Sequence, residues 1–284
     1  MWKRTLMAVG ILLWSTVAGA DVTIIKVEDG FKEVEHYKGG KMAMVADGDI
    51  TIVDVAAKTI TIINPETKVY AEATLEQYKK IMIDHFKRIH DMHLEMMMAA
   101  TGQSRAEATA ALKQLGGAAG KPKAVKMEKG AAKDIAGYPS EQYRFLVDGE
   151  PAREVWISSA VDALIAKEMG PGAKKALDAA FREMEAEFNA AVTVYSGQDN
   201  ALEKAVADVM AKGYLMHEIG GHMQFDGDKE PVPITVSTGR IDPSVFKVPP
   251  GYEKVGMAEF LERQMMADED YDYDDDDDDD DDDD

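Results

Sequence analysis

Residues 50–74 read ITIVDVAAKTITIINPETKVYAEAT, and this stretch decides the fold. Two runs rich in β-branched residues are followed by a turn signal, Asn64-Pro65, and by a third short run around Val69-Tyr70. Thr74 and Gln77 then have the spacing of a helix capping box. The stretch therefore predicts antiparallel strands that end where a helix begins.

The strand pattern extends back to Val22. Turn signals at Asp29-Gly30, Gly39-Gly40 and Asp47-Gly48 separate short apolar runs at intervals of about ten residues. Such a series predicts a β-meander that forms one curved antiparallel sheet.

The helix that follows Thr74 is predicted to have one apolar face. The residues at helical spacing on this face are Leu75, Tyr78, Met82, Phe86, Ile89, Met92 or His93, and Met96. Gly102 is expected to end the helix, and Ser104 with Glu107 forms a second capping box before a shorter helix to about Leu115.

Downstream of a Gly-rich connector at 116–122, strands and helices alternate again. Strands are predicted at 125–129, 142–147, 153–157, 214–219 and 232–237, with a turn at Tyr138-Pro139. Helices are predicted at 159–191, with an interruption at Gly170-Pro171-Gly172, and at 200–212 and 256–266. The order of elements predicts an α+β fold for residues 21–267.

The first twenty residues have the three regions of a secretory signal peptide. Lys3 and Arg4 precede an apolar run at 6–17, and Ala18-Gly19-Ala20 is a small-residue cleavage site. The alternative is an uncleaved anchor, but the run is short for a membrane span, and no later segment is long and uncharged enough. We expect a periplasmic or otherwise secreted chain that begins at Asp21 and does not span a membrane.

Composition excludes several classes of function. The net charge is −21, and fifteen of the 53 acidic residues lie in 268–284, so that the remainder carries −6. Neither this charge nor any basic stretch suits nucleic acid. The absence of Cys excludes disulfides, thiolate metal sites and Cys nucleophiles.

Residues 268–284 are predicted to be a disordered acidic tail, because dense like charges repel each other. Carboxylates bind Ca²⁺ and Mg²⁺, so alternate side chains of the tail are candidate weak ligands for divalent cations: Asp274, Asp276, Asp278 and Asp280. The alternatives are a solubilising tail and a tail that contacts a basic protein or a mineral surface.

The helix after Thr74 also contains a Met- and His-rich segment. His90, His93 and Met97 lie within two turns, and imidazole and thioether groups are copper ligands. The alternative is that the methionines pack in the core or line a pocket. A zinc-protease reading of His217 and His222 fails, because the two are five residues apart instead of four.

Four blocks of the sequence together resemble a bacterial exported family of unknown function with a LolA/LolB-like fold. The blocks are KGGKMAMVADG, the stretch at 50–74, AGYPSEQYRFLVDGEPAREVWIS and DPSVFKVPPGYEKV. The resemblance implies a strongly curved antiparallel sheet that forms an incomplete barrel, with helices over its concave side. It also implies that this fold shields an acyl chain or another apolar ligand. It implies no catalytic residues.

The main hypothesis is therefore a non-enzymatic carrier with an apolar or lipid-like ligand and no resident cofactor. The candidate lining residues are Tyr78, Met82, Phe86, Ile89, Met96 and Trp156, the last being the only Trp after leader removal. A metal-binding protein and an unrecognised hydrolase remain the alternatives, since carboxylates are numerous but none is singled out.

Overall fold

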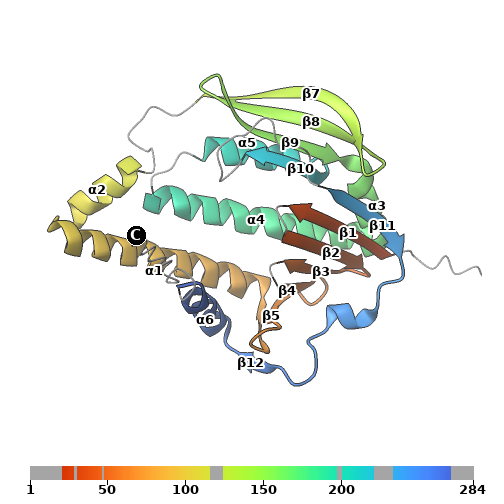
Figure 1. Ribbon diagram of the computed structural model, residues 1–284, viewed down its shortest axis with the longest axis horizontal. Helices are drawn as coiled ribbons and strands as arrows, with labels where there is room; N and C mark the ends of the chain where they lie inside the picture. Colours follow the sequence, from red (N-terminus) through yellow and green to blue (C-terminus); the bar gives the residue numbers. More distant parts are fainter. Residues whose placement is uncertain are drawn as a thin grey trace, which may run out of the picture.

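The computed structural model describes residues 21–28, 31–46, 48–115, 124–196, 200–220 and 233–269. In these ranges the fold is mixed α+β, with six α-helices and two β-sheets that are not closed into a barrel (Figure 1). The predicted leader at 1–20, the Asp29-Gly30 turn and the acidic run at 270–284 lie outside the described residues.

The larger sheet has eight strands in the order β11-β1-β2-β3-β4-β5-β6-β12. Their bounds are β1 Asp21–Glu28, β2 Phe31–Lys38, β3 Lys41–Ala46, β4 Asp49–Asp54, β5 Thr59–Asn64, β6 Val69–Thr74, β11 Ile234–Gly239 and β12 Glu253–Val255. Strands β1 to β6 are neighbours in chain order, as the turn signals predict. β12 runs parallel to β6, so the expectation of a wholly antiparallel sheet is wrong at this edge.

Both faces of this sheet are covered, because successive residues of a strand point to opposite sides. Val53 and Ile60 face the helices, whereas Ile52 and Ile63 face the opposite side. Residues 241–252 cover that opposite side with Ile241, Phe246 and Tyr252, and they include a 3₁₀-helix at Pro243–Phe246.

The helices are α1 Leu75–Thr101, α2 Arg105–Leu115, α3 Ser159–Met169, α4 Pro171–Ser196, α5 Ala201–Met210 and α6 Met257–Glu269. The capping box at α1 is confirmed: the Gln77 amide donates to Thr74 Oγ1 at 3.1 Å, and the Thr74 amide donates to Gln77 Oε1 at 3.0 Å. Gly102 ends the helix in the left-handed conformation, with a φ of 70°.

The second sheet has four antiparallel strands in the order β10-β9-β8-β7. Its strands are β7 Val125–Ile135, β8 Tyr138–Val147, β9 Glu150–Ser158 and β10 Tyr214–Gly220. A single sheet was expected. Two form because β7 to β9 pair with each other and with β10, while β12 occupies the free edge of β6. The turn predicted at Tyr138-Pro139 lies instead at Ala136-Gly137.

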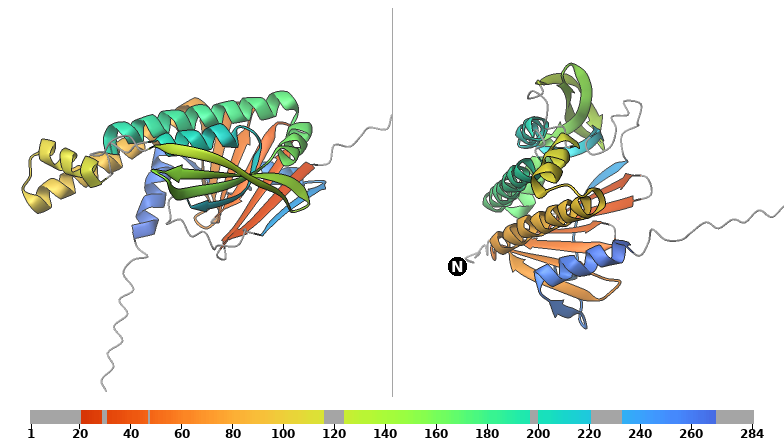
Figure 2. Two further views of the ribbon diagram at one scale, coloured as in Figure 1. Left: turned by 90° about the horizontal axis from the view of Figure 1, so that it is seen from above. Right: turned by 90° about the vertical axis from the view of Figure 1, so that its left-hand side faces the viewer.

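One core joins the two sheets. α1, α3, α4 and α6 pack on one face of the larger sheet, and Trp156 and Met216 of the second sheet enter the same buried cluster. α5 covers the other face of the second sheet, against Phe145 and Val155. α1 and α4 lie side by side, and α2 with the far end of α1 projects beyond the sheets (Figure 2). Among the described residues, no helix is both long and apolar enough to cross a membrane.

Candidate functional site: an apolar cavity between two helices

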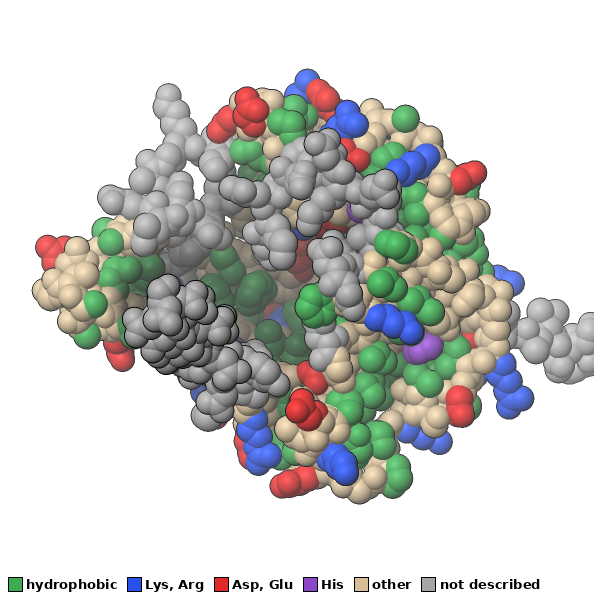
Figure 3. Space-filling model, in the orientation of Figure 1, with side chains coloured by type: hydrophobic (Ala, Val, Ile, Leu, Met, Phe, Trp, Pro, Cys, Tyr) green, Lys and Arg blue, Asp and Glu red, His purple; other side chains and the backbone are tan. Residues whose placement is uncertain are grey.

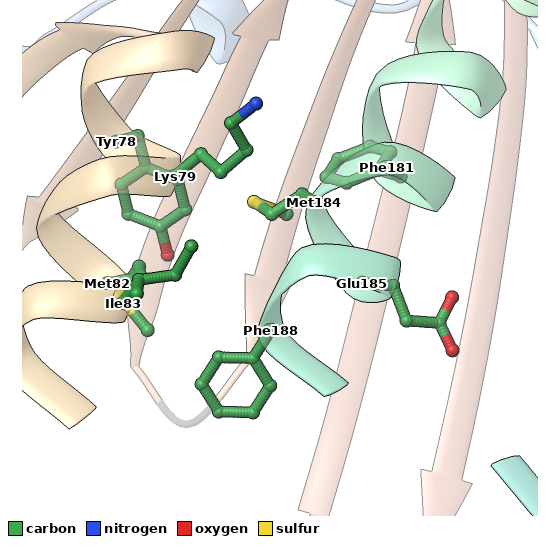
Figure 4. A pocket seen from close by; sticks show the side chains of 8 residues that line it. All are labelled: Tyr78, Lys79, Met82, Ile83, Phe181, Met184, Glu185 and Phe188. Atoms are coloured by element: carbon green, nitrogen blue, oxygen red, sulfur yellow. The ribbon is translucent and has the colours of Figure 1, made fainter. Parts of the chain in front are cut away.

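A cavity of about 300 Å³ lies between α1 and α4. Its lining residues are Tyr78, Lys79, Met82, Ile83, Phe181, Met184, Glu185 and Phe188 (Figure 4). In the orientation of Figure 1, hydrophobic side chains are visible inside a hollow near the middle of the molecule (Figure 3). The cavity is therefore mainly apolar, and only two of its lining residues are charged.

The α1 wall contains two of the residues that the sequence proposes as ligand contacts. Tyr78 and Met82 are one helical turn apart, and each is half-buried on the side that faces α4 (Figure 4). Burial raises the pKa of the Tyr78 hydroxyl, so that it stays neutral at physiological pH.

The α4 wall was not identified from sequence. Phe181, Met184 and Phe188 follow the i, i+3, i+7 spacing that places side chains on one helix face. This periodicity was available in the sequence, but only the structure shows that the face opposes α1. Phe86 of α1 does not line the cavity, but its ring packs edge-on against the lining residue Phe188 at a centroid distance of 5.2 Å.

Lys79 connects the two helices at the cavity. Its Nζ lies 3.0 Å from Glu76, 3.0 Å from Glu183 and 2.9 Å from Glu187, and the lysine is only 7% exposed. Hydrogen bonds to Glu187, Glu183 and Glu76 raise the pKa of Lys79, so its charge is retained. One ammonium is thus shared by three carboxylates from α1 and α4.

Glu185 is the second charged lining residue. It is exposed, and its carboxylate points away from the apolar side chains toward the other side of α4 (Figure 4). Desolvation raises the pKa of this carboxyl group, Glu203 acts in the same direction, and Arg153 acts against it.

A second cavity, of about 310 Å³, shares Phe181 and Glu185 with the first. It lies between α4, the larger sheet and the start of β10, and its lining is much more polar. On its floor Lys26 Nζ contacts Glu33 and Glu35 at 2.8 and 2.9 Å, and Tyr37 donates a hydrogen bond to Glu35. Desolvation opposes the charge on Glu35, yet its Lys26 and Tyr37 partners hold the pKa of this carboxyl below its ordinary value.

The other proposed ligand contacts lie elsewhere. Ile89 is half-buried on α1 but does not line the cavity, and Met96 is 62% exposed near the end of that helix. Trp156 faces the shared core, where its Nε1 donates to Glu154 Oε1 at 2.9 Å and Lys133 Nζ lies 4.2 Å from the ring centroid. The structure therefore brings Tyr78, Met82 and Phe86 together, apart from Trp156.

The metal candidates on α1, His90, His93 and Met97, differ in their exposure. The His90 side chain is largely buried with Nδ1 3.9 Å from Asp91, whereas His93 is exposed and Met97 is half-buried. Across the described ranges, no three His, Asp or Glu side chains converge as a metal site. Asp274, Asp276, Asp278 and Asp280 lie outside the described residues, so cation binding by the tail stays a prediction.

The residues of the rejected zinc motif have structural roles. His217 is 5% exposed in strand β10, and Glu218 bonds to Arg153 on the neighbouring strand. Burial, together with Lys133, lowers the pKa of His217, so its neutral form is favoured. His222 lies outside the described residues.

No protein-family model matches the chain, and no curated protein matches it. Function therefore has to be inferred from the cavity itself.

Proposed function

We propose that the protein is an exported, non-enzymatic carrier that holds an apolar, lipid-like molecule between α1 and α4. The observation that carries the proposal is the cavity of about 300 Å³ with its largely hydrophobic lining. This volume is at the lower end of the range typical of ligand sites, roughly 300–1,000 Å³. Methionine and phenylalanine walls suit a ligand without a fixed shape, because methionine is flexible and polarizable.

The proposal includes finer features that the sequence suggests. These are a strongly curved, LolA/LolB-like sheet and a leader whose removal after Ala20 would release the chain into the periplasm. The order of the elements supports the first, since a six-strand meander leads directly into a helix that packs on the sheet. The charged, apolar and small-residue regions of 1–20 support the second.

The test is binding of N-phenyl-1-naphthylamine, a neutral apolar dye whose fluorescence rises in a hydrophobic site. Met82→Trp places a larger side chain in the cavity and should weaken dye binding about tenfold, a loss of about 1.4 kcal/mol. Met184→Trp repeats the change from the opposite wall and should act in the same direction. Circular dichroism establishes that each variant is folded.

Met96→Trp is the matched control. It makes the same substitution on the same helix, but at an exposed position outside the cavity. Its dye affinity should equal that of the wild type. Equal affinity in all the folded variants, or the absence of any dye binding, would contradict the proposal.

Native mass spectrometry of the protein purified from its own cells then addresses the natural ligand. An additional mass of several hundred daltons that disappears on denaturation is the expected result. A bare protein mass, together with dye binding that does not depend on the cavity, would refute the carrier function.

A further inference from the structure

The rim of the cavity between α1 and α4 has an excess of negative charge. Lys79 is the only cation among the described lining residues, and three glutamates already share it. Glu185 adds a fourth carboxylate, and no basic side chain in the described part of the chain lies within ion-pair distance of it. Lys79 is therefore the single cation at a cavity with four carboxylates, three of which it contacts, while Glu185 points toward the other side of α4.

This balance disfavours the most familiar apolar ligand, a fatty acid. A carboxylate head group at Lys79 would have to replace Glu183 or Glu187 and would still lie beside the remaining glutamates. Like charges placed together oppose binding, and such repulsion is a usual source of specificity. The presence of a lysine in the lining is thus no evidence for an anionic ligand.

The neighbouring cavity extends the same charge pattern. Lys174 Nζ lies 2.6 Å from Asp162 and 2.7 Å from Asp178, and both carboxylates line that cavity. Lys26 is likewise shared by two glutamates. Arg182 also lines that cavity. Its lining therefore has three cations, Lys26, Lys174 and Arg182, against four carboxylates, Glu35, Asp162, Asp178 and Glu185, so the balance on this side of α4 is negative by one charge.

Phe181 and Glu185 are the residues that connect the two cavities, since both line each of them. An aliphatic chain that extends from the first cavity toward the second would pass the Phe181 ring and reach the side of α4 to which the Glu185 carboxylate points. Both groups attract an ammonium ion, the carboxylate by its charge and the ring by its negative face.

We propose that the ligand is a single-chain amphiphile with a cationic head group, whose chain lies between α1 and α4 and whose ammonium group lies at Glu185. This inference rests on the proposed carrier function and names the class of its ligand. It assigns Glu185 as the residue that selects the charge of the head group, while the hydrophobic lining binds the chain whatever the head group is.

Three ligands with the same ten-carbon chain test the inference by displacement of N-phenyl-1-naphthylamine from the chain that begins at Asp21. Decylamine carries a positive charge at pH 7, like the side chain of lysine. Decanol is uncharged, and decanoate is an anion. All are used below the concentration at which they aggregate. Decylamine should displace the dye at the lowest concentration, decanol at a higher one and decanoate at the highest.

Glu185→Gln should weaken displacement by decylamine about fivefold, as expected for one solvent-accessible ion pair, and should leave decanol unchanged. Glu66→Gln, at an exposed turn between β5 and β6, is the matched control with the same net charge. It should leave all three ligands unchanged, and because it retains the acidic tail it accounts for non-specific attraction of the amine.

The outcomes separate the two proposals. Decanoate binding as tightly as decylamine, or an affinity for decylamine that is unchanged in Glu185→Gln, would overturn the cationic ligand and leave the carrier function intact. Failure of all three ligands to displace bound dye, decanol included, would overturn the carrier function and this inference with it.

Discussion

At the scale of single residues, Lys79 has the most consequential position in the molecule. It is almost buried although it is charged, and its three partners come from two helices that are about a hundred positions apart in the chain. The same residue therefore holds α1 against α4 and forms part of the cavity lining. Exposed ion pairs contribute little individually, but a lysine shared by three carboxylates suppresses repulsion among them.

Lys79→Met should lower the Tm, because Glu76, Glu183 and Glu187 would then repel each other without a counter-ion. Salt screens such repulsion, so the loss should be largest at low ionic strength and should shrink at about 1 M salt, where the screening length is roughly 3 Å. Differential scanning calorimetry across a salt series measures both effects.

Lys80→Met is the control for this variant. Lys80 is exposed on the same helix, and the substitution removes the same charge and changes the side chain in the same way. It should change the Tm little. A loss of the same size in both variants, or a loss in Lys79→Met that salt does not reduce, would contradict the role assigned to Lys79.

At the scale of elements, the connection from α5 to β10 depends on a close backbone approach at Gly213. A Cβ atom there would lie 2.8 Å from Ile157 Cγ2 and 2.8 Å from the backbone oxygen of Ser158. Because a backbone atom cannot move aside as a side chain can, Gly213→Ala should destabilise the protein by about 1–3 kcal/mol. Urea unfolding measures the change.

Gly172→Ala is the comparison at a position with space. It lies in the first turn of α4, where an added Cβ would meet no atom within 4 Å. Alanine has the higher helix propensity, so the variant should be unchanged or more stable by up to about 1 kcal/mol. Equal destabilisation in the two variants would show that packing at Gly213 is not the cause.

The elements that could be predicted are those with local signals. The capping boxes at Thr74 and Ser104 mark two helix starts, and Gly170 separates α3 from α4 as its sequence context predicts. Strand β7 runs further than predicted, to Ile135, because it continues past Gly130 through an irregularity in its pairing with β8.

Long-range pairings could not be predicted in the same way. β12 joins β6 although about 180 residues separate them, and no local pattern specifies which strand occupies that edge. Only one wall of the cavity could be predicted from the sequence. Tyr78 and Met82 follow from the apolar face of α1, whereas Phe181 and Met184 could be assigned only once the structure showed that α4 lies beside α1. Met96 continues the same sequence pattern beyond the end of the sheet, where nothing covers it among the described residues.

At the scale of the whole molecule, the two sheets share one core and should unfold together. Trp156 in the second sheet belongs to the same buried cluster as Ile60 in the larger one. Ile60→Ala removes a side chain that is 3% exposed and should cost about 2–5 kcal/mol. If unfolding is cooperative, the midpoint reported by Trp156 fluorescence shifts by as much as that reported by circular dichroism.

Val27→Ala, at a position 39% exposed near the end of β1, should shift neither midpoint by a comparable amount. A shift in circular dichroism without one in Trp156 fluorescence would mean that the sheets unfold independently.

The strand order of the larger sheet has a consequence for how the chain is made. Strands β1 to β6 can pair as each emerges, but β11 covers β1 and β12 covers β6 only after residues 234–255 have been synthesised. Until then both outer strands expose unpaired amide and carbonyl groups, which can pair with other chains. Nascent or truncated chains that end before β11 should therefore aggregate. On the export route proposed above, the chain would need its final strands, or a chaperone, to remain monomeric.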